Sequence, residues 1–175
     1  MMPSQWHDWH DFYMLLGTAS AALVALLFVA VSIGASFLSL ERSTATRTFM
    51  SPVVFHFSTL LVISLIALVP SHTAQSLATG ITLVAIAGLA YTTVVLVGLA
   101  RASVSDIADR FGYGIFPMAS YVAMLAAAGL VISRATLGAD ILAAALLLLL
   151  AINIRNAWDL MLAFARQVAS KGSDT

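Results

Sequence analysis

The sequence predicts an all-α, polytopic membrane protein with five transmembrane helices in a single domain. Hydrophobic residues make up 61% of the chain and charged residues only 9%, compared with about 25% charged residues in soluble domains. The few charges separate five apolar segments, each close to the length that a helix needs to cross a bilayer. We therefore expect residues 1–175 to form one transmembrane domain. Its spans are expected at about residues 12–40, 52–69, 77–100, 113–133 and 139–164.

The first segment is the one around which we expect the others to be organised. Residues 12–40 contain no charge over 29 residues, well above the roughly 20 apolar residues of a minimal span. At about 100° per residue, its small and hydroxyl-bearing residues share one side of the helix, here called the small-residue face. This face comprises Thr18, Ala22, Ala25, Val29, Ser32, Ser36 and Ser43, with Ala21 and Ser39 just beside it. Leu16, Leu23, Leu27, Val31 and Leu38 lie opposite, with Ser20 and Gly34 as exceptions.

Small residues on a membrane helix have two explanations, and the sequence leaves both open. They let two helices approach closely, or they line a pore around the axis of an oligomer. Lipid offers small side chains no packing partner, so we expect the small-residue face to meet protein or water.

The later spans carry their own boundary signals. Ser51 followed by Pro52 is typical of a helix start, so we expect the second span to begin there. Residues 70–73 form a turn before the third span, and a polar stretch at 101–112 separates the third span from the fourth. The fourth span has Pro117 in its first turns. The fifth span is one apolar run to Ile152, and we expect polar helix to continue past that residue, because Arg155 and Asp159 are spaced i,i+4.

The distribution of basic residues predicts the orientation. Seven of the eight Lys and Arg residues fall on one side of the five spans, and only Arg134 falls on the other. Because basic residues collect on the cytoplasmic side, we expect the N-terminus outside and the C-terminus in the cytoplasm. Trp6, Trp9 and Tyr13 would then form an outer aromatic belt, and Trp158 an inner one.

The composition also excludes several classes of function. The formal net charge is zero, so no basic face is available for nucleic acid. The chain has no cysteine, which excludes disulfides, thiolate metal sites and cysteine nucleophiles. No hydrolase, P-loop or dinucleotide-binding motif is present. We therefore expect no enzyme, no catalytic residue and no cofactor.

A metal site at the outer end is an alternative to a purely interfacial N-terminal segment. His7 and His10 are spaced i,i+3 and alternate with carboxylates, and His72 lies in a turn that we expect on the same side. Such a set can hold a divalent ion. The alternative is that these histidine and tryptophan rings lie at the depth of the lipid headgroups.

His56 is a candidate pH sensor. It lies about one turn into the second span, and ionisable residues inside a membrane are costly and often functional. Imidazole also titrates near physiological pH. The alternative is a neutral histidine that hydrogen-bonds to a neighbouring helix.

Two groups of polar residues lie at the expected cytoplasmic boundary. Glu41, Arg42 and Arg47 follow the first span; around an oligomer axis they would form charged rings at a pore mouth. The alternative is that these three residues are ordinary charges that set the membrane topology. The second group is expected to dock the fifth span onto a neighbouring helix. It comprises Asn153, Arg155, Asn156, Trp158 and Asp159.

Three sequence stretches resemble a family of small multi-span bacterial proteins of unassigned function. They are GTASAALVALLFVAVSI at 17–33, LER at 40–42 and NAWDL at 156–160. The resemblance implies a bacterial inner (plasma) membrane location and carries over no catalytic residue. Some members bear automatic labels as modulators of a membrane protease.

Two functions follow from these features. The first is a homo-oligomeric ion channel with the first helix near the axis. The second is a non-conducting accessory or scaffold subunit that regulates another membrane complex. In both cases we expect the chain to lie in the lipid bilayer. For the channel, the expected partner is a second copy of the chain, and for the accessory subunit it is another membrane protein complex.

Overall fold

The computed structural model describes residues 9–35, 43–70, 73–101, 110–133 and 135–172. Over these ranges the chain is helical apart from short turns. Its elements are α2 (His10–Ala35), α3 (Ser43–Leu68), α4 (Ala74–Arg101), the π-helix η2 (Phe111–Ile115), α6 (Phe116–Ile132) and α7 (Leu137–Gly172).

Five stretches of the described helices are long and apolar enough to cross a membrane. They are His10–Ala30, Ser51–Leu68, Ala74–Arg101, Phe111–Ile132 and Leu137–Ala163. Each corresponds to one of the five expected spans, so the prediction of an all-α chain with five membrane-length helices is confirmed.

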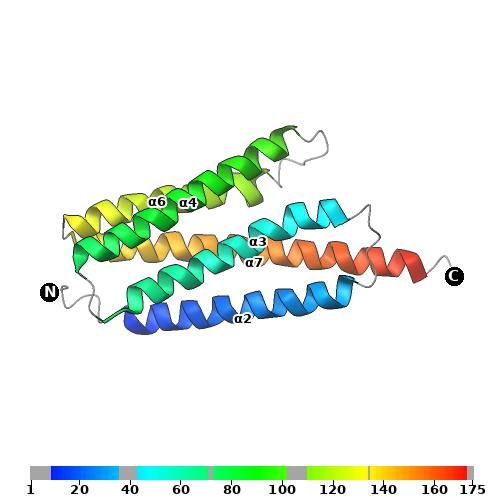
Figure 1. The fold of residues 1–175 in the computed structure, drawn as a ribbon, viewed down its shortest axis with the longest axis horizontal. Helices are drawn as coiled ribbons and strands as arrows, with labels where there is room; N and C mark the ends of the chain where they lie inside the picture. Colours follow the sequence, from blue (N-terminus) through cyan, green and yellow to red (C-terminus); the bar gives the residue numbers. More distant parts are fainter. Residues whose placement is uncertain (1–8, 36–42, 71–72, 102–109, 134, 173–175) are drawn as a thin grey trace.

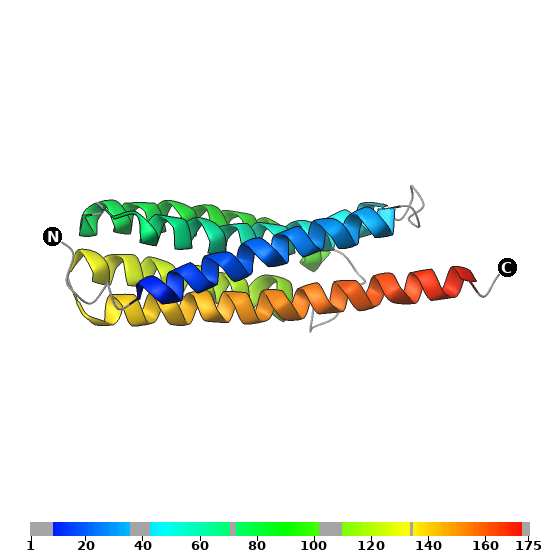
Figure 2. The same ribbon diagram turned by 90° about the horizontal axis from the view of Figure 1, so that it is seen from below.

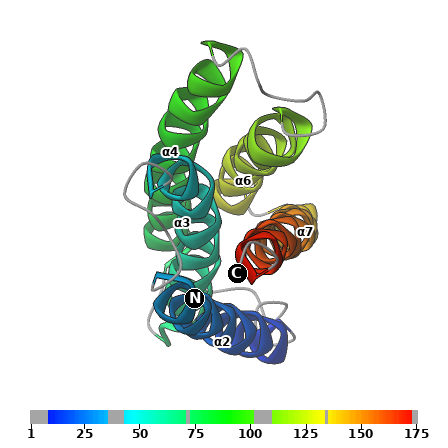
Figure 3. The same cartoon turned by 90° about the vertical axis from the view of Figure 1, so that its right-hand side faces the viewer.

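The helices form an elongated bundle of antiparallel neighbours (Figure 1). Helices α2, α4 and α7 run in one direction, and α3 and α6 run in the other (Figures 1 and 2). Seen along the bundle, α2, α3 and α4 stand in one row, and α6 and α7 stand beside them (Figure 3). Helix α3 is central, because it packs against α2, α4 and α7.

The centre of the bundle is filled by large apolar side chains. Most of them come from α3, α6 and α7, and their exposed surface is almost zero. The largest include Phe57, Leu60, Ile63, Tyr121, Met124, Leu142 and Leu146. These side chains therefore fill the interior of a single bundle at the level of the residues named here.

The apolar part of the second span begins at Ser51, as expected, but the expectation that the helix itself starts there is wrong. Helix α3 begins at Ser43, so Pro52 lies inside the helix rather than in its first turn. The polar residues 43–50 extend the helix before the apolar stretch at Ser51, because a membrane span and a helix need not share an end. Proline is tolerated inside membrane helices when other groups replace the lost hydrogen bond.

Helix α4 begins earlier than expected because two hydroxyls cap it. The Thr73 hydroxyl oxygen accepts from the backbone N–H of Ser76 at 3.1 Å. In return the Ser76 hydroxyl oxygen accepts from the N–H of Thr73 at 3.0 Å. This reciprocal pair has the geometry of a capping box, with serine in the position that glutamate usually takes.

The π-helix η2 follows from Pro117. In an α-helix the proline ring would clash with the carbonyl group four residues earlier, and a π-turn relieves this clash by widening the helix. The backbone N–H of Phe116 donates to the carbonyl oxygen of Phe111, which is the π-helical pattern. In the same pattern the carbonyl of Gly112 would pair with residue 117, which has no N–H group.

Helix α7 confirms the expected polar extension of the last span. It runs for 36 residues to Gly172, although its membrane-length part ends at Ala163. Figures 1 and 2 show its last turns extending beyond the neighbouring helices.

Candidate functional site

The small-residue face of α2 points away from the rest of the bundle. Its members on α2 are Thr18, Ala21, Ala22, Ala25, Val29 and Ser32, and all of them are exposed. Ser43, which we expected on the same face, is instead the first residue of α3. The opposite side of α2 packs inward, with Leu16 and Leu27 buried. Within one chain, α2 approaches α3 closely at Gly17. A Cβ added to Gly17 would lie 3.1 Å from Cβ of Ser64 on α3. Among the described residues, the small-residue face of α2 is thus not part of the buried interface between the helices.

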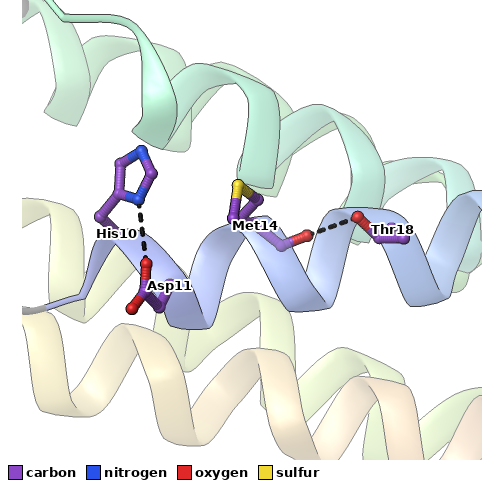
Figure 4. Close-up of polar contacts among 4 residues, drawn as sticks. All are labelled: His10, Asp11, Met14 and Thr18. Carbon is purple, nitrogen blue, oxygen red and sulfur yellow. Dashed lines mark hydrogen bonds and ion pairs between the residues drawn. The ribbon is translucent and has the colours of Figure 1, made fainter.

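The hydroxyl groups on this face bond to their own helix. The Thr18 hydroxyl donates to the carbonyl oxygen of Met14 at 2.8 Å (Figure 4), and the Ser32 hydroxyl donates to that of Phe28 at 2.8 Å. Each hydroxyl oxygen keeps lone pairs that can accept a hydrogen bond from water. The face is therefore compatible with contact to protein and with contact to water.

The remaining predicted pore residues follow Ala35, the last residue of α2, in the sequence. Ser36, Ser39, Glu41 and Arg42 lie outside the described residues. Arg47 was expected before the start of the second helix, and instead it lies in the first turns of α3.

The outer histidines are only partly described. His7 and His72 lie outside the described residues. His10 is the first residue of α2, and its Nδ1 lies 3.2 Å from Oδ1 of Asp11 (Figure 4). In the part of the chain that the structure describes, no three metal-binding side chains gather. The metal site remains a prediction.

His56 lies inside the bundle, with 1% of its surface exposed. Its Nδ1 is 2.8 Å from the hydroxyl oxygen of Tyr121 on α6, and that hydroxyl is 3.2 Å from Oγ1 of Thr59. The hypothesis of a histidine bonded to a neighbouring helix thus matches the geometry. We call His56, Thr59 and Tyr121 the His56 network.

Two aromatic rings contact the His56 ring, Phe55 from the same helix and Tyr91 from α4. The ring of Tyr91 on α4 stacks on Phe55, with centroids 4.1 Å apart, and it meets the His56 ring edge-on. The Tyr91 hydroxyl donates to the hydroxyl of exposed Ser51 at 2.9 Å.

Two amides dock α7 onto its neighbours, as expected. Asn153 donates from Nδ2 to the carbonyl oxygen of Val53 on α3 at 2.8 Å. Asn156 donates from Nδ2 to the carbonyl oxygen of Gly112 at 2.9 Å. The second bond supplies the donor that Pro117 cannot, so Asn156 completes the backbone hydrogen bonding of η2.

The other members of this group face outward. Nε of Arg155 is 3.8 Å from Oδ2 of Asp159, and both side chains are half-exposed. Exposed pairs of this kind contribute little to stability. Trp158 is 65% exposed.

Trp158 borders an apolar groove of about 290 Å³ between α2, α3 and α7. Nearly all of its lining is hydrocarbon or aromatic. The lining residues are Leu23, Leu26, Leu27, Ala30, Phe57, Ile154, Ala157, Trp158 and Met161.

The sequence did not predict the partners of His56. A tyrosine in an apolar segment carries a polar group that usually needs a partner when buried. That signal was present at Tyr91 and Tyr121, but the pairing with His56 depends on which helices are neighbours.

Comparisons with protein-family models, with curated proteins and with solved structures found no match.

Proposed function

We propose that the chain is a subunit of a homo-oligomeric ion channel in which α2 lies nearest the axis. The observation that carries the proposal is the outward position of the small-residue face. Thr18, Ala22, Ala25, Val29 and Ser32 are exposed in one chain, where they would contact only lipid. Small residues gain nothing from lipid, but they allow close approach between copies or leave room for water.

The packing inside one chain supports a path between copies rather than through a single copy. Phe57, Leu60 and Ile63 of α3 have no exposed surface, and they fill the middle of the bundle. An ion path needs polar groups or water along its length. The hydroxyls of Thr18 and Ser32 offer such groups on the outside of α2.

The charges after the first span support a preference for anions. Arg42 and Arg47 outnumber Glu41 by two to one. Rings of basic side chains favour anions. Under the orientation expected from the basic residues, these rings lie at the cytoplasmic mouth, and the membrane is a bacterial inner membrane.

The direct test is conductance of the purified chain in a planar lipid bilayer. Val29 is the largest side chain on the small-residue face and would form the apolar constriction, so Val29→Ser should raise the basal conductance. Val94→Ser is the matched control, because Val94 is 71% exposed on α4 and away from the proposed axis. Protein that assembles correctly and never conducts across voltage, pH and tension would refute the channel.

The reversal potential in a salt gradient tests the selectivity. Wild type should favour anions, and Arg47→Glu should abolish or invert that preference because it reverses the sign of the mouth. If the Arg47→Glu channel conducts with an unchanged reversal potential, Arg47 does not line the mouth of the pore.

The second candidate is a non-conducting accessory subunit, which the groove beside Trp158 favours. Its apolar lining between α2 and α7 fits the side chain of a partner helix. A photo-crosslinking residue at position 158 in native membranes separates the candidates. A defined adduct with one other membrane protein, together with absent conductance, would support the accessory role, and adducts with lipid alone would count against it.

A further inference from the structure

One nitrogen of His56 has no hydrogen-bond partner although it is buried. Among the described residues, nothing bonds to Nε2, while Nδ1 faces the Tyr121 hydroxyl. A buried polar atom without a partner costs stability. Such an atom on a residue that can bind a proton requires an explanation.

The direction of each hydrogen bond in the His56 network defines the protonation of the ring. The Thr59 hydroxyl donates to the carbonyl oxygen of Phe55 at 3.1 Å. Its oxygen is then free to accept from Tyr121, whose hydroxyl donates to it. Tyr121 has one proton to give, so its oxygen accepts from His56, and Nδ1 carries the hydrogen. Nε2 is therefore a bare lone pair.

A second acceptor without a partner lies on α7, next to the same part of α3. Asn153 uses its Nδ2 to bond to the carbonyl oxygen of Val53, one turn before His56. Its Oδ1 is buried and has no partner among the described residues. A proton on Nε2 would make that nitrogen a donor, and a hydrogen bond from it to Oδ1 of Asn153 would then satisfy both acceptors.

No charged group that the structure describes faces His56 from the helices around it. From α4 the facing group is Tyr91 and from α6 it is Tyr121, while α7 reaches the preceding turn of α3 through the neutral amide of Asn153. The titratable and charged residues of the described α2 lie at its other end, before Gly17. They are His10, Asp11 and Tyr13. On α7, Arg155 and Asp159 pair with each other on the exposed side.

The other charged residues of the described helices lie near helix ends. They are Arg47, Arg101, Arg110, Asp140, Arg166 and Lys171. Among the described residues, a proton on His56 would thus add a charge with no opposite charge beside it. The amide oxygen of Asn153 is an acceptor without a partner on the helix that bonds to the preceding turn of α3.

We infer that His56 and Asn153 form a proton-responsive contact between α3 and α7. In the neutral state Asn153 holds α7 only through the carbonyl of Val53. Proton uptake at Nε2 adds a charge-assisted hydrogen bond to Oδ1 of Asn153, and this bond changes how α7 sits on α3. The contact belongs to one chain, so it does not depend on the proposed channel.

Nitrogen NMR of the full chain in lipid nanodiscs tests the first step. The chain has four histidines, and His56→Gln assigns the signal of His56. At about pH 8 the Nδ1 signal should lie in the protonated range and the Nε2 signal in the bare range. Finding the proton on Nε2 instead would overturn the inference.

Asparagine labelling tests the second step, because the chain contains only Asn153 and Asn156. As the pH falls from about 8 to about 4, the Asn153 amide signal should shift together with Nε2 of His56. Asn156 bonds to Gly112 and is the internal control, which should stay constant. An Asn153 signal that is unmoved while His56 binds its proton would refute the contact.

Two variants separate this contact from a general effect of pH. In His56→Gln the pH-dependent shift of Asn153 should be lost, whereas in His10→Gln, at an exposed histidine, it should persist. If His56→Gln does not fold, Tyr121→Phe replaces it. That variant removes the acceptor of the Nδ1 hydrogen, so the preference of the neutral ring for Nδ1–H should be lost, and an unchanged preference would contradict the inference.

Discussion

The ring of Tyr121 lies where a side chain at Gly88 would have to go. A Cβ added to Gly88 would overlap Cδ1, Cε1 and Cζ of Tyr121. The hydroxyl of the same ring bonds to His56. The absence of a side chain at Gly88 on α4 therefore leaves room for the Tyr121 ring of α6 to reach His56 on α3. The His56 network depends on this space.

Gly88→Ala is expected to destabilise the bundle by about 1–3 kcal/mol, because the tyrosine ring is rigid and must move aside. The movement should also break the hydrogen bond between Tyr121 and His56. Unfolding in a graded detergent mixture measures the loss. Gly98→Ala is the matched control on the same helix, because nothing lies within 4 Å of a Cβ added there. Equal stability of the two variants would contradict the packing.

Asn156→Leu is expected to destabilise the start of the fourth span. The carbonyl of Gly112 would lose the donor that replaces the missing N–H of Pro117, and a buried unpaired carbonyl costs about 1–3 kcal/mol. Pro117→Ala provides a rescue, because alanine restores a backbone N–H at position 117. The cost of Asn156→Leu should therefore be smaller in a Pro117→Ala background. A cost that is the same in both backgrounds would show that Asn156 acts in another way.

Hydropathy and charge predicted the number and positions of the helices, and the reason is physical. A bilayer requires about 20 apolar residues per helix whatever the neighbours are. The helix ends were less predictable. Ser51 and Pro52 have the sequence pattern of a helix start, but the helix begins earlier. Residues 43–50, which precede the apolar stretch, are already helical.

The faces of α2 show what a single sequence leaves open. Its pattern separates a small-residue face from a leucine face, but lipid and protein interior are equally apolar. Hydrophobicity alone therefore does not say which face packs inward. The structure buries Leu16 and Leu27 together with Gly17, and it turns Ala22 and Ala25 outward. Similarly, His56 was recognisable as a candidate, but its bond to Tyr121 joins residues 65 positions apart in the sequence.

The orientation is testable with single cysteines, because the natural chain has none. Seven basic residues on one side against one on the other predict the N-terminus outside and the C-terminus inside. Ser4→Cys should react with an impermeant maleimide added to intact cells, and Ser173→Cys should react only after the membrane is opened. Reaction of both cysteines in intact cells would exclude the five-span orientation.

Assembly is testable through the exposed alanines of α2. Ala22→Leu and Ala25→Leu add bulk to the small-residue face, where a second copy would need close approach, so each should reduce the fraction of oligomer several-fold in native mass spectrometry. Both residues are exposed in one chain, so the variants should fold as stably as the wild type. Ala126→Leu and Ala144→Leu are the matched controls, because they make the same change at exposed positions of α6 and α7. If all four variants keep the wild-type oligomer, or if the wild type is a monomer in lipid, α2 lies at no interface between copies and the proposed axis is lost. A loss confined to Ala22→Leu and Ala25→Leu would place the small-residue face between copies, which is the arrangement that a pore along α2 requires.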